Sequence, residues 1–79
     1  MMTLRQRWQK GTRYYQVEIC LDLWGQWTLI QQWGRCGTRL GQMRRHPCAS
    51  YAEAVTHWTR IARRRQQHGY YLIDSLHLD

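Results

Sequence analysis

A strand-like alternation of side chains between residues 14 and 23 constrains the fold more than any other feature. In this segment, YYQVEICLDL, one side carries apolar residues and the other side polar ones: Tyr15, Val17, Ile19, Leu21 and Leu23 against Gln16, Glu18, Cys20 and Asp22. A period of two is typical of a β-strand with one buried face and one solvent-exposed face. The rest of the chain must therefore supply a layer that covers the apolar face.

Further strands are predicted on either side of this one, joined by short connections. They are residues 4–8, residues 27–33 after a hairpin turn at 24–26, residues 42–46, and a last short strand at 70–73. Gly11 can take a positive φ in the first connection. Pro47 cannot donate to a sheet ladder and marks an edge or an exit. Short connections of this kind predict an antiparallel sheet.

One amphipathic helix is predicted from Ser50 to His68-Gly69, where glycine suits the left-handed cap position. Residues 50–53 match the S-x-x-E capping box, in which serine accepts a backbone N–H and glutamate reaches back. An apolar stripe then recurs at three- and four-residue steps and must pack on the sheet: Tyr51, Ala54, Val55, Trp58, Ile61 and Ala62. The predicted fold class is α+β, an antiparallel β-sheet of about four to five short strands with one amphipathic α-helix packed across it.

The 79 residues are expected to form a single domain, 1–79, with a core at about 4–73 and a short C-terminal tail at 74–79. Its small core must be dense in large side chains, which five Trp and five Tyr supply. No apolar run is long enough for a membrane span, and no signal peptide is expected. The three cysteines are widely spaced without a C-x-x-C pair, which favours reduced thiols and a cytoplasmic setting.

A net charge of +7 predicts a polyanionic partner, most often nucleic acid. Eleven of the twelve cations are arginine, whose planar fork suits bidentate phosphate contacts. A generic basic surface, or an arginine bias of the genome, remains an open alternative for the same composition.

Few residues offer catalytic chemistry. Glu53 is expected in the helix cap, and Glu18 and Asp22 lie four apart on the wet face of one strand, where solvated carboxylates are expected. His46 and Cys48 match no zinc spacing, and no glycine-rich phosphate loop occurs. The sequence therefore predicts no enzyme, no cofactor and no metal site. An enzyme that uses His46 and Cys48 is the least favoured alternative.

An ordered set of motifs identifies a family resemblance. Trp33-Gly34-Arg35 is followed by Cys36-Gly37, Gly41-Gln42, the capped helix and Gly69-Tyr70. This order resembles the WGR domain, which is named for the tripeptide and occurs in DNA-dependent poly(ADP-ribose) polymerases and as bacterial modules. The tripeptide alone is weak evidence, but the whole set covers about residues 4–73. We expect a stand-alone protein of the bacterial type.

The resemblance implies an antiparallel sheet with one helix laid across it and a role in binding DNA, particularly at ends and breaks. In the polymerases, the tryptophan of the motif packs on the sugar of a terminal nucleotide, and the arginine contacts nucleic acid and neighbouring domains. Trp33 and Arg35 match those positions, and Gly34 between them lets the backbone approach closely. The polymerase activity is not implied, because no catalytic region accompanies the motif.

The predicted nucleic-acid-binding residues combine the motif with nearby arginines: Trp33, Gly34, Arg35, Arg39, Arg44 and Arg45. Consecutive strand residues point to opposite faces, so at most one of Arg44 and Arg45 can face a given surface. Alternatively, Trp33 is a core residue at a strand end, and Arg35 is solvated or braces a turn.

The predicted function is a non-catalytic module that binds DNA through phosphate contacts and an exposed Trp/Arg motif. RNA stays an open alternative, and no membrane partner is expected. The rival function is a protein-interaction adaptor that docks on a larger enzyme or an acidic partner. Tryptophan and arginine are also enriched at protein interface hot spots, so composition does not separate the two. Oligomeric state is left open.

Overall fold

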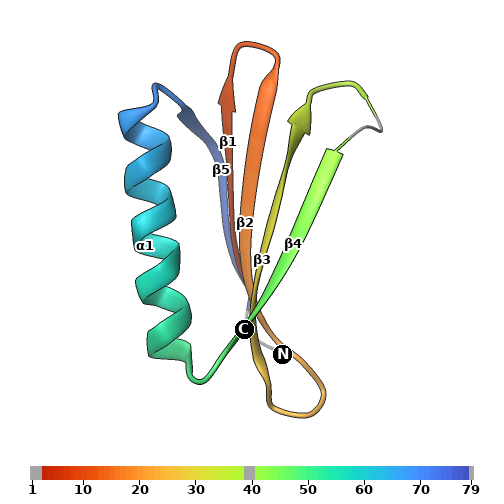
Figure 1. Ribbon diagram of the computed structural model, residues 1–79, viewed down its shortest axis with the longest axis vertical. Helices are drawn as coiled ribbons and strands as arrows, with labels where there is room; N and C mark the ends of the chain where they lie inside the picture. Colours follow the sequence, from red (N-terminus) through yellow and green to blue (C-terminus); the bar gives the residue numbers. More distant parts are fainter. Residues whose placement is uncertain (1–2, 39–40, 79) are drawn as a thin grey trace.

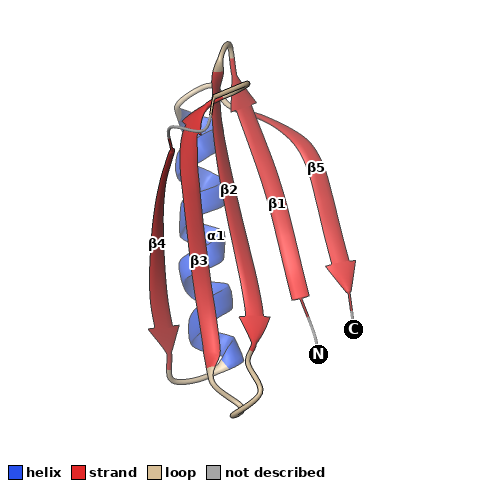
Figure 2. Cartoon of the chain, turned by 90° about the vertical axis from the view of Figure 1, so that its right-hand side faces the viewer, coloured by secondary structure: helices blue, strands red, loops and turns tan. Residues whose placement is uncertain are grey.

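The computed structural model describes residues 3–38 and 41–78, which form an antiparallel sheet with one helix across one face (Figure 1, Figure 2). In chain order the elements are β1 (Thr3–Lys10), β2 (Arg13–Leu21), β3 (Trp27–Arg35), β4 (Gly41–Cys48), α1 (Tyr51–Gln67) and β5 (Tyr71–Leu78). The five strands are ordered β4-β3-β2-β1-β5. Helix α1 therefore connects the two edge strands, and the predicted α+β fold class is confirmed.

The strand register separates two faces of the sheet. Ile19 pairs with Leu29 and Tyr15 with Trp33, and these residues share the face that α1 covers. The buried core on this face consists of Val17, Ile19, Leu29, Cys48 and Ala54. The other face, which we call the open face, is turned toward the viewer in Figure 2 with α1 behind the sheet.

Helix α1 begins at the predicted capping box. Ser50 Oγ accepts a hydrogen bond from the Glu53 N–H at 3.1 Å, and Glu53 Oε2 accepts one from the Ala49 N–H at 2.9 Å. The glutamate thus reaches the residue before the cap. At the other end, Gly69 has φ of 83°, the left-handed conformation that glycine adopts without a Cβ penalty.

The turn between β2 and β3 starts earlier than expected. Strand β2 ends at Leu21 because Asp22 Oδ1 accepts hydrogen bonds from the N–H groups of Trp24 (2.9 Å) and Gln26 (2.8 Å), which bends the chain. Leu23 was expected on the buried side of this strand but lies in the turn, 84% exposed. The expectation for Leu23 was wrong, since a local aspartate turn took precedence over the apolar pattern.

Strands β1, β3, β4 and β5 all run further than expected, and the difference matters most for β4 and β5. Pro47 lies within β4 rather than after it, which an edge strand tolerates because one side of its backbone has no partner strand. Strand β5 extends to Leu78, so residues expected in a frayed tail are strand up to that position. Pairing along β1 holds them, and Asp74 Oδ2 lies 3.8 Å from Arg5 Nη2 on the open face.

In the described part of the chain, no helix is long and apolar enough to cross a membrane. Cys20, Cys36 and Cys48 are unpaired thiols. Burial raises the pKa of the Cys48 thiol, and Glu53 adds to this effect. Cys48 therefore acts as a core side chain rather than a nucleophile.

Candidate nucleic-acid interface

Two neighbouring rows of side chains cross three strands near one end of the sheet. The inner row is aromatic and the outer row is cationic: Trp8, Tyr15 and Trp33, then Lys10, Arg13 and Arg35. Residues two apart in a strand share a face, so both rows stand on the face that α1 covers. We call this the basic end. Figure 1 shows the β1–β2 turn, the end of β3 and the end of α1 together there.

The inner row is a packed aromatic support. Trp8 is only 3% exposed, and the rings of Tyr15 and Trp33 stack with centroids 5.9 Å apart and planes inclined by 12°. Trp33 itself is half-buried. The indole is therefore neither the exposed platform expected for a binding residue nor a fully buried core residue. One part of it packs inside, and its orientation is fixed by Tyr15.

Helix α1 holds this support in place through Arg65. The Arg65 guanidinium lies over the Tyr15 ring at 4.4 Å and over the Tyr70 ring at 5.1 Å. Burial raises the pKa of the Tyr15 hydroxyl, although Arg65 and other arginines act in the opposite direction. Gln31 Nε2 also donates a hydrogen bond to this hydroxyl at 3.0 Å. Tyr15 is therefore neutral at physiological pH, and the support for Trp33 does not change with pH there.

The outer row places like charges side by side. Arg13 and Arg35 are exposed and directly opposite each other on β2 and β3. Lys10 Nζ donates a hydrogen bond to the His68 carbonyl at 2.7 Å, which joins β1 to the end of α1. Among the described residues, no carboxylate forms an ion pair with any of the three. Unpaired guanidiniums at this spacing favour a bound anion, and each can form two parallel hydrogen bonds to a phosphate.

The turn after β3 fixes where Arg35 stands. The Cys36 N–H donates to the Thr12 carbonyl at 2.7 Å, which ties this turn to the β1–β2 turn. The Arg35 carbonyl accepts from the Thr38 N–H at 3.3 Å and from Thr38 Oγ1 at 3.0 Å. Gly37 has φ of 78° and completes the turn. The backbone of Arg35 is thereby braced while its side chain stays exposed.

A hollow of about 260 Å³ opens at the basic end. It is lined by Arg13, Tyr14, Trp33, Gly34, Arg35 and Tyr70. Tyr14, Gly34 and Gly41 lie opposite one another on the open face, and a Cβ on Gly41 would stand 2.9 Å from the Tyr14 hydroxyl. The tyrosine side chain thus reaches across positions that carry no side chain.

The other predicted arginines separate by face. Arg44 lies opposite Gln31 on the face that α1 covers, and Arg45 lies opposite Ile30 on the open face. Arg44 thus shares a face with Trp33, and Arg45 does not. Arg39 lies outside the described residues.

A smaller hollow of about 100 Å³ lies between α1 and the sheet. It is lined by Tyr15, Gln31, Arg60, Ile61, Arg64 and Arg65.

Comparison with known proteins agrees with the motif order. The family model of the WGR domain matches residues 1–75. This chain belongs to the WGR domain family. An uncharacterised protein of Sinorhizobium fredii (strain NBRC 101917 / NGR234), y4dW, is 36% identical over 58 residues. The match spans 73% of this chain but only 28% of that protein. Membership supports a nucleic-acid-binding module in general, and the WGR domain is a non-catalytic domain family.

In this WGR domain, the tripeptide occupies the end of β3. Trp33 belongs to the aromatic row and Arg35 to the cationic row. Sequence reasoning missed Lys10, Arg13 and Tyr70. Lys10 and Arg13 could have been predicted from the sequence. A two-residue turn at Gly11 places Lys10 opposite Arg13, and the pairing of neighbouring strands then places Arg13 opposite Arg35. The binding role of the predicted residues stays a prediction.

Proposed function

We propose that this WGR domain is a non-catalytic module that binds DNA, at ends or breaks, through the basic end. The observation that carries the proposal is the cationic row beside the aromatic row, with no carboxylate paired to it in the described parts of the chain. Family membership and the net charge of +7 support the same partner.

In this proposal the two rows have different tasks. Arg13 and Arg35 bind backbone phosphates, which positions the duplex without reading its sequence. The accessible part of Trp33 then packs against the sugar or base at a terminus. Inside a duplex, each base is covered by its neighbours, so this apolar contact is open only where stacking is interrupted. A nick or an end therefore binds more tightly than continuous duplex.

The proposal is tested by fluorescence anisotropy of a labelled duplex across a salt series. Arg35→Gln and Arg13→Gln remove one charge each from the basic end, and Arg45→Gln removes the same charge from the open face. A lost phosphate contact lowers the slope of log K against log salt by about 1. We expect this loss in the first two variants and not in the third. Equal losses in all three would show that the charge acts generically and would overturn the site.

An adaptor role is the second candidate, and one observation favours it. The β2–β3 turn exposes Leu23 by 84% and Trp24 by 87%, at the opposite end of the molecule from the basic end. Aromatic side chains anchor many protein interfaces. If the adaptor role holds, a purified protein partner binds with an affinity that Trp24→Ala abolishes and salt barely changes. A partner whose binding is lost with salt and not with Trp24→Ala would contradict it.

A further inference from the structure

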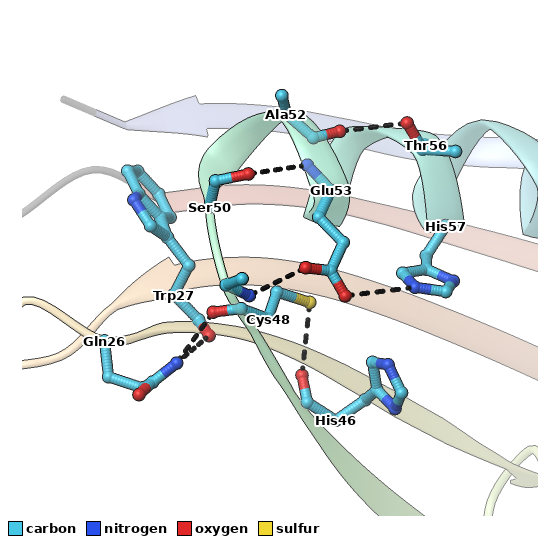
Figure 3. Close-up of polar contacts among 10 residues, drawn as sticks. Gln26, Trp27, His46, Cys48, Ser50, Ala52, Glu53, Thr56 and His57 are labelled. Atoms are coloured by element: carbon cyan, nitrogen blue, oxygen red, sulfur yellow. Dashed lines mark hydrogen bonds and ion pairs between the residues drawn. The ribbon is translucent and has the colours of Figure 1, made fainter.

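A group of potential metal ligands lies at the start of α1, away from the basic end. His46 comes from β4, and Glu53 and His57 come from the first turns of α1 (Figure 3). One ligand atom from each residue lies within 4.8 Å of the other two. The rings of His46 and His57 meet edge to face with centroids 4.7 Å apart.

The backbone elements bring these side chains together for clear reasons. Residues four apart on a helix stand on the same face, so Glu53 and His57 are neighbours. His46 lies on the helix-covered face of β4, opposite Leu29. Sequence reasoning missed the group, because it compared His46 with nearby cysteines and assigned Glu53 to the cap alone.

Glu53 serves the cap through one carboxylate oxygen and turns the other toward His57. Its Oε2 accepts the Ala49 N–H at 2.9 Å, and its Oε1 is directed toward His57 Nε2 at 3.8 Å (Figure 3). A backbone hydrogen bond to one carboxylate oxygen is the kind of outer contact that orients metal ligands. The carboxylate therefore enters a metal site already oriented, without a loss of the helix cap.

The spacing suits a small ion better than a direct contact. The 3.8 Å between Glu53 Oε1 and His57 Nε2 is longer than a hydrogen bond. Zinc–ligand bonds of about 2.1 Å in tetrahedral geometry place ligand atoms about 3.4 Å apart. The separations of up to 4.8 Å within the group must shorten by as much as about 1.4 Å through rotation of the histidine side chains. His46 is exposed. An ion from solution can therefore reach the group.

We propose that His46, Glu53 and His57 form a binding site for a divalent transition metal, with Zn²⁺ as the best match. Imidazole nitrogens with one carboxylate oxygen suit zinc and its neighbours in the series, whereas Mg²⁺ and Ca²⁺ prefer sites made of oxygen alone. Three protein ligands leave one position for water. The ion links β4 to α1 and is independent of nucleic-acid binding, since the basic end lies at the other end of α1.

The test is a zinc titration of the untagged protein by calorimetry and by thermal unfolding, with Co²⁺ absorption as a probe of geometry. His46→Ala and His57→Ala remove one ligand each, and His68→Ala removes a histidine at the far end of α1. We expect one ion per chain and a rise in Tm of roughly 10–20 °C at a hundredfold excess over Kd. Affinity should fall by at least about tenfold in the first two variants only.

Several outcomes would overturn the proposal. Zinc that leaves the Tm of the parent protein unchanged would do so, and so would binding that survives both histidine substitutions but disappears when the thiols are alkylated. Imidazole NMR signals provide a readout that needs no variant. Those of His46 and His57 should shift with zinc while those of His68 stay in place, and a shift of His68 alone would also refute the site.

Discussion

Replacing Arg35 with glutamine should change stability and DNA affinity in opposite directions. Arg35 and Arg13 are exposed and directly opposed, and neither has a carboxylate partner among the residues that the structure describes. Their repulsion therefore opposes folding as long as no anion is bound. Glutamine removes the charge but keeps a long polar side chain, so the change in side-chain bulk is small.

The size of the effect follows from Coulomb's law. With the charges of Arg13 and Arg35 taken as about 7 Å apart, their repulsion in water is about 0.6 kcal/mol. Screening reduces this to about 0.5 kcal/mol at 0.01 M salt and about 0.2 kcal/mol at 0.15 M. For a domain of this size, Arg35→Gln should thus raise Tm by roughly 2–4 °C at low salt and by about 1 °C at physiological salt.

Thermal unfolding at the two salt concentrations measures this gain, with Arg45→Gln as the matched control. Arg45 lies opposite Ile30, so its loss relieves no such repulsion. Short duplex DNA should reverse the ranking, because it stabilises the parent protein more than the Arg35 variant. A variant that is less stable than the parent at low salt would show that Arg35 braces the fold, and the reasoning would fail.

Three further predictions concern packing, capping and pH. Gly41→Ala should lower the free energy of unfolding, measured in urea, by about 1–2 kcal/mol, because the new Cβ meets the Tyr14 hydroxyl. In the double variant, Tyr14→Phe should recover part of this loss. If the effects of the two substitutions simply add, the contact is contradicted. Ser50→Ala should cost about 1 kcal/mol, and an unchanged urea midpoint would contradict the cap. Burial raises the pKa values of Cys48 and Tyr15 in the folded protein, so these two side chains lose their protons at lower pH in the unfolded chain than in the folded one. The free energy of unfolding should therefore be retained below about pH 9 and fall as pH rises further; a rise would refute the assignment.

Local patterns predicted the elements that depend on local physics. The alternation in residues 14–23 gave the central strand, and the S-x-x-E sequence gave the start of α1, because each of these features is satisfied within a few residues. The turn at Asp22 was not predicted, because it depends on one side-chain hydrogen-bond acceptor. A side-chain hydrogen bond that ends β2 carries no signal in the apolar pattern.

The features that sequence reasoning missed depend on which segments pair. The length of β5 follows from its partner β1, and the partial burial of Trp33 follows from its stacking on Tyr15. By contrast, the alternation of strand residues alone predicts that Arg44 and Arg45 point to opposite faces of the sheet, as the structure shows. The proposed metal site joins His46 of a strand to Glu53 and His57 of a helix, so its members are not adjacent in any local motif.

The central claim is that the basic end binds DNA where stacking is interrupted. The most direct measurement titrates the protein against a blunt-ended duplex and against the same duplex closed by loops at both ends, at about 50 and 200 mM salt. The account predicts tighter binding to the open-ended DNA at both concentrations, and loss of that difference in Trp33→Ala. Equal affinity for the two DNAs, falling together with salt, would contradict end recognition and leave only generic charge.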